Sequence, residues 1–149
     1  MSHFGYKIAG NCLVVLQIPK RAKTNESRPV THRQTAKYRC DEARVMSIVH
    51  LKKGKHSSCV SSSWDTSFKY RVGKKVRVSN YDCDSTNVCS NGIHYFLNPV
   101  GAYVYWSARY DVENDGRVYD EANDALTHEE CIENCKRKLR KRVGQLLTQ

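Results

Sequence analysis

The sequence predicts an α+β fold in which a twisted, mostly antiparallel sheet is followed by a C-terminal amphipathic helix. Short aliphatic and aromatic runs are separated by turn residues, which is typical of antiparallel strands. The segment 109–121 contains the Asp-Gly pair of a tight β-hairpin. The end of the chain instead repeats its apolar residues with helical spacing. The length of 149 residues fits one domain, so we predict a single domain over 1–149.

Two aliphatic runs predict the first buried strands. Residues 11–18 form a β-branched and aliphatic run that Pro19 closes, and residues 44–51 form the next. Between them, residues 20–35 are polar and basic and contain breakers such as Pro29. We therefore expect 20–35 to be a flexible basic loop.

The middle of the chain predicts further strands joined by polar turns. Residues 64–68 suggest a short turn that buries two aromatic side chains. Residues 69–78 alternate apolar and basic side chains, which predicts a strand with a basic outer face. Its expected core-facing residues are Tyr70, Val72, Val76 and Val78. The run 89–97 begins with the turn Ser90-Asn91-Gly92 and continues as a core strand, and the aromatic run 103–106 predicts another.

Residues 127–147 are predicted to form the C-terminal helix. Thr127 is suited to the N-cap position, and Glu130 completes a capping box. The apolar stripe consists of Ile132, Cys135, Leu139, Val143, Leu146 and Leu147. A small domain can hide such a stripe by dimerising, so we expect a homodimer.

The formal net charge of +10 predicts attraction to polyanions such as DNA or RNA. Residues 1–109 contain eighteen Lys/Arg against six Asp/Glu, so the charge is concentrated before the acidic segment 110–130. The candidate nucleic-acid-binding residues are Lys69, Arg71, Lys74, Lys75 and Arg77 of the basic sheet face, and Lys136, Arg137, Lys138, Arg140, Lys141 and Arg142 of the tail. The sheet group can alternatively be a solvated face, and part of the tail run can be structural, because cations suit the C-terminus of a helix. The tail run also resembles a nuclear-import signal.

Seven cysteines, an odd number, and the lack of an apolar leader at the N-terminus favour free thiols in a reducing compartment. Cys89 and His94 are a candidate nucleophile and base, because an imidazole can activate a thiol. Strand alternation places residues five apart on opposite faces. The alternative is therefore a buried cysteine and a hydrogen-bonded core histidine.

Metal binding has two weak signals in the sequence. His128, Cys131 and Cys135 share one face of the predicted helix, and Cys83, Cys89 and His94 are loosely spaced. The segment 111–122 partly imitates a calcium loop, but Ala122 stands where a carboxylate is needed. The alternatives are an apolar helix stripe and a hairpin. No cofactor is predicted, and no segment is long and apolar enough for membrane insertion.

Four segments together resemble a known family. They are LQIPKRAKT (16–24), AKYRCDEARVMSI (36–48), SWDTSFKYRVGKKVRVSNYD (63–82) and CSNGIHYFL (89–97). In this order they resemble a domain of unknown function found in large DNA viruses of amoebae, often beside pentapeptide repeats, over residues 6–106. The chain is also similar to small abundant virion proteins of the marseillevirus type. It departs from the family pattern at Val88, where the family has an acid, and at 98–101, where an acid-rich helix usually follows.

The resemblance implies a setting, the virion or the host cytoplasm or nucleus, and no particular reaction. Together with the charge, it leads us to expect a non-enzymatic basic viral protein that binds nucleic acid or another polyanion. A structural or host-protein interaction module is the first alternative. A cysteine-dependent enzyme that uses Cys89 and His94 is the second.

Overall fold

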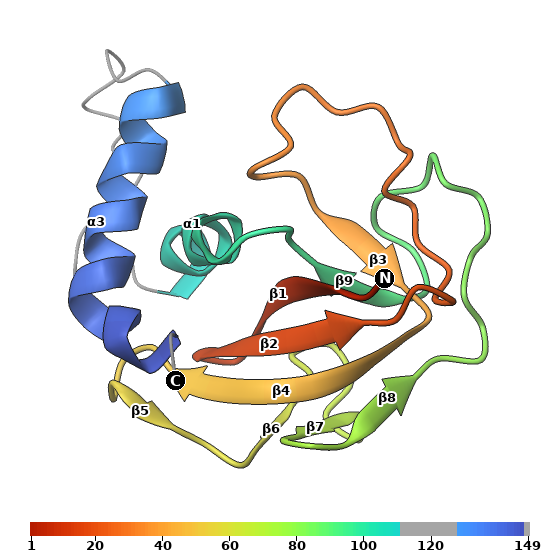
Figure 1. Ribbon diagram of the computed structural model, residues 1–149, viewed down its shortest axis with the longest axis horizontal. Coiled ribbons are helices and arrows are strands. Elements are labelled where there is room, and N and C mark those ends of the chain that lie inside the picture. The colour runs from red at the N-terminus through yellow and green to blue at the C-terminus, as the bar shows by residue number, and fades with distance from the viewer. Residues whose placement is uncertain (111–127, 148–149) are drawn as a thin grey trace.

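The computed structural model describes residues 1–110 and 128–147 (Figure 1). The strands are β1 (His3–Ala9), β2 (Cys12–Ile18), β3 (Tyr38–Cys40), β4 (Glu42–His50), β5 (Lys55–His56), β6 (Cys59–Ser61), β7 (Lys69–Arg71), β8 (Lys75–Arg77) and β9 (Ile93–Tyr95). The helices are α1 (Pro99–Tyr110) and α3 (His128–Leu147). The predicted α+β class is confirmed: antiparallel sheets are combined with a C-terminal helix.

Five strands form the main sheet, in the order β1-β2-β4-β5, with β8 also pairing with β4. Two-stranded ribbons, β3–β9 and β6–β7, complete the strand pairing in the described residues, and every named pair is antiparallel. Tyr6 and Phe96 exchange backbone hydrogen bonds of 2.9 and 2.7 Å, which join the β3–β9 ribbon to the free edge of β1.

The main sheet has a hydrophobic core on each side. One core contains Ile8, Leu13 and Val49 from the sheet together with apolar residues of α1 and α3. The other contains Val14, Leu16 and further residues of the opposite face, packed against the β3–β9 and β6–β7 ribbons. Because the first residues of β2, such as Leu13 and Val14, are buried on opposite faces, this part of the strand is a continuous apolar run rather than an alternating one.

The strands predicted at 11–18 and 44–51 are confirmed as β2 and β4, but β1 was not predicted. Its sequence, HFGYKIA, mixes polar and apolar residues without strict alternation. The missed signal is the Gly10-Asn11 pair, which forms the two-residue turn to β2. Gly10 has a φ of +58°, the left-handed conformation that such hairpin turns require.

The strand predicted at 103–106 is wrong, because these residues lie in α1. The Asn98 side chain accepts a hydrogen bond of 2.9 Å from the backbone N–H of Gly101, which is the contact of a helix N-cap. Pro99 follows as the first helical residue, where its missing N–H has no cost. Local capping and burial of Tyr103 and Trp106 against the sheet therefore override the strand preference of aromatic side chains.

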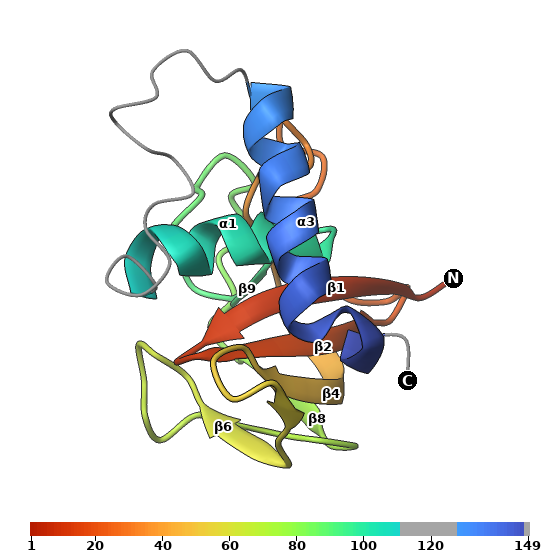
Figure 2. The same ribbon diagram turned by 90° about the vertical axis from the view of Figure 1, so that its left-hand side faces the viewer.

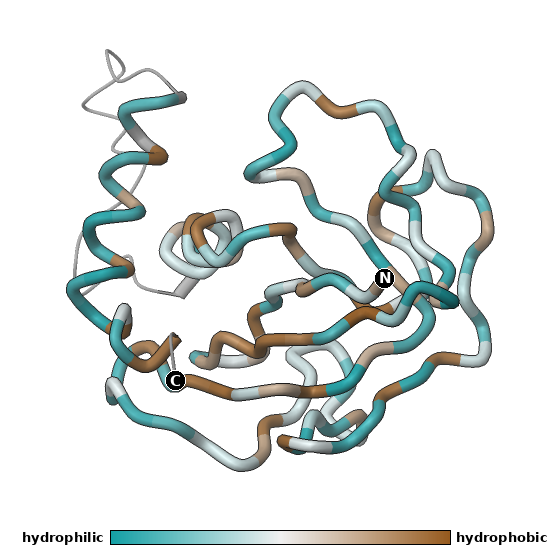
Figure 3. Tube along the Cα trace, viewed as in Figure 1, coloured by the Kyte–Doolittle hydropathy of each residue, from teal (hydrophilic) through white to brown (hydrophobic). Residues whose placement is uncertain are grey.

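The predicted C-terminal helix is confirmed as α3, which lies beside α1 over the same face of the sheet (Figure 2). The hydrophobic positions of α3 point toward α1, and its outer side is hydrophilic (Figure 3). Leu139 and Val143, expected to offer surface for a dimer, are instead buried in the chain's own core. The capping residue Thr127, the hairpin at 109–121 and the calcium-like segment 111–122 lie largely or wholly outside the described residues.

The alternating segment 69–78 does not form one strand. It forms β7 and β8, which belong to different sheets and are separated by a turn. Tyr70 and Val76 are buried as predicted, whereas Val72 in the turn is exposed. Of the two aromatic side chains predicted to be buried in 64–68, Trp64 is 79% exposed and Phe68 is partly buried. Within the described residues, no helix has the length and apolar character needed to cross a membrane.

Candidate functional site

The segment 89–97 supplies both a core strand and the wall of a cleft. Its strand, β9, pairs with β3 in the register Arg39↔His94, and Ile93 and Tyr95 on either side of His94 are buried. The turn before β9 includes Gly92, which has a φ of +153°. A Cβ on Gly92 would lie 3.1 Å from the Cβ of Arg39 and 3.2 Å from the Tyr81 ring, so a larger residue would require these neighbours to shift.

Arg39 fixes the loop that leads into this turn. Its side chain is fully buried and donates hydrogen bonds to four backbone carbonyls, those of Asp82, Asp84, Asn87 and Asn91. The guanidinium is planar and carries five N–H donors, so it can satisfy several carbonyls at once. The loop 82–91 is therefore folded around a cation supplied by β3.

Two further side chains hold the same loop. Asn25 accepts a hydrogen bond of 2.8 Å from the Arg39 backbone N–H and donates one of 3.4 Å to the Asn87 carbonyl. Asp82 accepts hydrogen bonds from the Ser90 hydroxyl at 2.6 Å and the Asn87 amide at 2.8 Å. These bonds lower the pKa of Asp82 to about 2. Asn25, in the expected flexible loop 20–35, is fully buried, so that loop is anchored at this point.

A cleft of about 270 Å³ lies between this loop, β1 and β7. It is lined by Lys7, Ser62, Trp64, Asp65, Phe68, Tyr70, Val78, Asn80, Ser90, Asn91, Gly92, Ile93 and His94. Three of these residues are aromatic, and the rings of Phe68 and Tyr70 pack with their centres 5.3 Å apart. The cleft thus combines an aromatic wall with the polar segment 90–94.

Lys7 is a buried cation in this cleft. It is 7% exposed, and its Nζ lies 5.2 Å from the centre of the Tyr70 ring. Across the described residues, no carboxylate lies within salt-bridge distance of Nζ and no hydrogen-bond acceptor contacts it. Burial and, to a smaller extent, the charge of Lys37 lower its pKa from 10.5 to about 8. Lys7 therefore still carries a proton at neutral pH.

His94 lies in the same cleft as a neutral imidazole. Burial and then the charges of Lys7, Lys37 and Arg39 lower its pKa to about 4, against a backbone hydrogen bond with Val88 that raises it. Its Nε2 is buried and has no hydrogen-bond partner in the described part of the chain. A buried nitrogen without a partner is costly, so a hydrogen-bond donor that reached this atom would relieve that cost.

The candidate pair of Cys89 and His94 does not have the environment of a nucleophile and base. Cys89 is exposed in the loop before β9, whereas His94 points into a site surrounded by cations. With a pKa of about 4, the imidazole is too weak a base to deprotonate a thiol efficiently near neutral pH. The alternative prediction, a buried cysteine, is wrong for Cys89, and His94 is only partly buried.

The basic residues of 69–78 fall on two surfaces. Lys69 and Arg71 flank the buried Tyr70 on β7, and the Lys69 ammonium donates a hydrogen bond of 2.9 Å to the Ser61 hydroxyl. Lys75 and Arg77 flank the buried Val76 on β8, at the edge of the main sheet. Lys74 lies in the exposed turn between the two strands.

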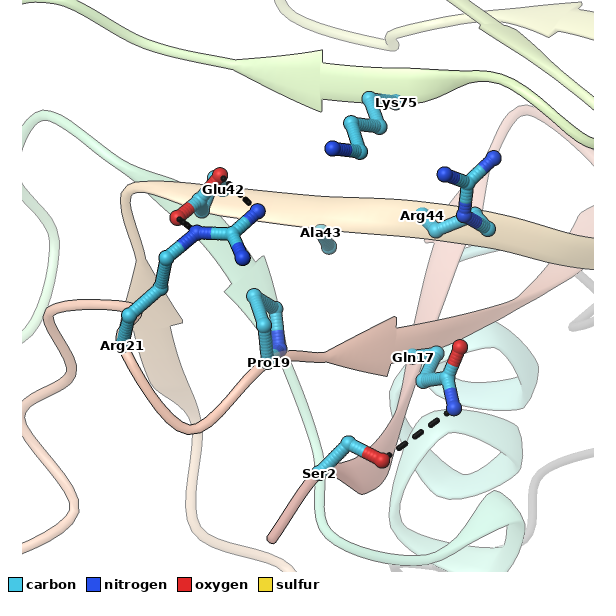
Figure 4. A pocket seen from close by; sticks show the side chains of 8 residues that line it. All are labelled: Ser2, Gln17, Pro19, Arg21, Glu42, Ala43, Arg44 and Lys75. Atoms are coloured by element: carbon cyan, nitrogen blue, oxygen red, sulfur yellow. Dashed lines mark hydrogen bonds and ion pairs between the residues drawn. The ribbon is translucent and has the colours of Figure 1, made fainter.

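Arg44 of β4 completes a cationic surface that the sequence did not predict. It lies directly opposite Lys75, and Arg77 lies two residues further along β8, so all three side chains share a part of the sheet surface that the helices leave uncovered. We call Arg44, Lys75 and Arg77 the open-face triad. Arg44 and Lys75 line a hollow of about 250 Å³ (Figure 4). The neighbouring carboxylate, Glu42, is engaged by Arg21 at 2.8 Å, and in the described residues no carboxylate pairs with the triad.

The basic residues of α3 lie on the other side of the molecule from β8 (Figure 1). Arg137, Arg140 and Lys141 are exposed, and Lys138 is partly exposed. Lys136 pairs with Glu133 at 3.2 Å. Arg142 packs over the Trp106 ring at 5.2 Å and hydrogen-bonds to the Leu51 carbonyl at 3.4 Å. The tail run is therefore a separate surface, and Arg142 has a structural role in it.

The metal-ligand candidates on α3 are only partly described. Cys135 is fully buried in the core beneath α1, while the side chains of His128 and Cys131 fall outside the described residues. Over the described ranges, no three His, Cys, Asp or Glu side chains gather as metal ligands. Cys12, Cys40, Cys59, Cys83 and Cys89 are free thiols.

Sequence reasoning missed Lys7, Arg39 and Arg44. Lys7 follows Tyr6 in a strand that was not predicted, so its inward position could not be assigned. Arg39 lies between Tyr38 and Cys40, and all three are fully buried. An arginine between two apolar residues in a short strand was the available signal for a buried polar contact.

Comparison with known proteins assigns the sequence to a family of unknown function. The model of a family of unknown function, DUF5758, matches residues 2–102, which is more than half of the chain. No curated protein and no solved structure matches the chain.

Proposed function

This chain belongs to the DUF5758 family, and we propose that it acts by binding nucleic acid through the open-face triad, without reading sequence. The observation that carries the proposal is the convergence of Arg44, Lys75 and Arg77 on an uncovered sheet surface with no pairing carboxylate in the described residues. Unpaired cations gain most from contact with phosphates, because binding releases the counterions that phosphates hold.

The net charge of +10 extends this attraction beyond the contact itself. The exposed cations of β7 and α3 would raise the local concentration of a polyanion without necessarily contacting it. We propose that the triad makes the phosphate contacts, because its side chains project from adjacent strands of one sheet. The sheet fixes the backbone positions from which these three side chains project.

The test is fluorescence anisotropy with a short labelled DNA duplex and a single-stranded RNA, each measured at several salt concentrations. The triple variant R44Q/K75Q/R77Q should bind more weakly and show a shallower salt dependence, by about 0.9 in the log–log slope for each duplex phosphate that the variant no longer neutralises. The triple variant R137Q/R140Q/K141Q removes the same charge from exposed positions of α3 and is the matched control. Affinity that does not change with salt, or an equal decrease in affinity for both variants, would contradict the proposal.

A second candidate is a structural or host-protein interaction module, which includes homodimer formation. It is favoured by large apolar side chains that are exposed, among them Phe4 at 49% and Met46 at 42%. Light-scattering mass of the purified protein, with and without the duplex, separates the two candidates. A dimer whose mass is unaffected by DNA would favour the second.

We propose the virion, and the host cytoplasm or nucleus, as the setting for this binding. The support is the resemblance of the four quoted segments to a domain of large DNA viruses. Mass spectrometry of purified particles tests this setting, and absence of the protein from particles would restrict it to the infected cell.

A further inference from the structure

We propose that the cleft lined by Lys7, Tyr70, His94 and Trp64 binds a small organic anion that carries a planar ring, for which a nucleoside monophosphate is the chemical model. This site is distinct from the open-face triad, which lies on the other face of the sheet and shares no lining residue with it. A volume of about 270 Å³ suits a small molecule better than a peptide or duplex.

The anionic group follows from Lys7. Lys7 is 7% exposed, and in the described part of the molecule its ammonium has the Tyr70 ring as a neighbour but no carboxylate within salt-bridge distance. A largely buried cation gains from a nearby opposite charge. Asp65 is the one carboxylate among the lining residues, but it is solvent-exposed and hydrogen-bonds to the Ser67 hydroxyl at 2.6 Å and the Ser67 amide at 3.0 Å. An anionic ligand would supply the missing partner.

A hydrogen-bond donor on the ligand follows from His94. Its imidazole is neutral at physiological pH and its buried Nε2 has no partner in the described residues. A neutral imidazole nitrogen that carries no proton accepts a hydrogen bond. The ligand is therefore expected to present both an anionic oxygen to Lys7 and an O–H or N–H group to His94.

The planar ring follows from Trp64. This residue lines the cleft and is 79% exposed, so its ring can be reached by a ligand in the cleft. An indole face stacks favourably on a nucleobase, whichever base it is. Phe68 and Tyr70 extend the aromatic surface inward toward Lys7.

Tryptophan fluorescence reports directly on this site. The protein contains two tryptophans, and Trp106 is fully buried under α3, so Trp64 alone is accessible to ligand or quencher. Titration with uridine monophosphate should quench the Trp64 emission saturably. Uridine should bind more weakly because it lacks the anion, and inorganic phosphate more weakly because it lacks the ring.

Variants separate the two parts of the contact. Lys7→Met should weaken uridine monophosphate binding about tenfold to a hundredfold, as measured by calorimetry. Lys69→Met, on the outer face of β7, is the control and should leave the affinity for uridine monophosphate unchanged. Trp64→Ala changes an exposed position that folding does not need. It should weaken the binding of uridine monophosphate and leave the affinity for inorganic phosphate unchanged. Equal affinity of wild type and Lys7→Met, or absence of saturable quenching, would overturn the proposal. The R44Q/K75Q/R77Q variant should retain nucleotide binding, so failure of either proposal is recognised separately.

Discussion

Replacement of Lys7 by methionine is expected to stabilise the protein. Because the pKa of Lys7 falls from 10.5 to about 8, and one pKa unit corresponds to about 1.4 kcal/mol, its protonated form lowers the free energy of unfolding by about 3 kcal/mol at pH 7. Methionine has a similar length and no charge, so it removes this cost. It also loses the packing of the ammonium on the Tyr70 ring, worth about 1–2 kcal/mol when buried. The expected net gain is about 1–2 kcal/mol.

The pH dependence of the stability difference between wild type and Lys7→Met identifies the Lys7 charge as its cause. The cost is fully present below the folded-state pKa of about 8, and it disappears as the pH rises toward 10.5, where the unfolded chain also loses the proton. Around Lys7, Cys40 has its pKa raised to about 12 and His94 has its pKa lowered to about 4, so neither changes charge in this window. Burial raises the pKa of Tyr70 and lowers the pKa of Lys37. Both groups are present in wild type and in Lys7→Met, so their titration affects both proteins alike.

Urea unfolding of wild type and Lys7→Met at pH 7, 9 and 10.5 measures this difference. The advantage of the variant should shrink steadily across the three values, and Lys69→Met should match wild type within about 0.5 kcal/mol throughout. A variant that is less stable than wild type at pH 7, or a difference that does not change with pH, would refute the reasoning.

Two further predictions concern buried contacts. Arg39→Lys should destabilise the protein by about 3 kcal/mol or more, because a lysine ammonium cannot satisfy all the carbonyls that the guanidinium contacts. Hydrogen exchange should then show faster exchange of the backbone amides of 82–91. Arg77→Lys, at an exposed position, is the control. Trp106→Ala should cost about 3–5 kcal/mol through loss of packing and of the 3.1 Å hydrogen bond to Asn11, measured by thermal unfolding. Trp64→Ala should change stability little, and a cost similar to that of Trp106→Ala would show that the exposed ring is part of the core.

The sequence predicted those elements whose local pattern agrees with their burial. The aliphatic run of β2 and the helical stripe from Ile132 to Val143 each specify one structure, and both are confirmed. Conflicts between signals produced the errors. In α1, aromatic strand preference competed with the Asn98 cap and Pro99, and the cap decided the outcome.

The candidate site was predictable only in part. The segment 89–97 could be identified from its turn and its apolar run, and it does form one wall of the cleft. Lys7 and Tyr70, by contrast, are brought to that wall by β1 and β7, which are far apart in sequence. No local pattern indicates that a lysine in an edge strand lacks a partner, because this property depends on every segment packed around it.

The boundary of the family match divides the molecule in an informative way. The match ends at residue 102, within α1, so most of the helical layer lies beyond it. Ile8, Leu13 and Val49 are covered from that layer, by Trp106, Leu139 and Val143 among others. Without these helical residues, the apolar face of the sheet would be exposed to solvent. The helical residues beyond position 102 therefore complete a core that the matched part begins, on the face of the sheet opposite the cleft.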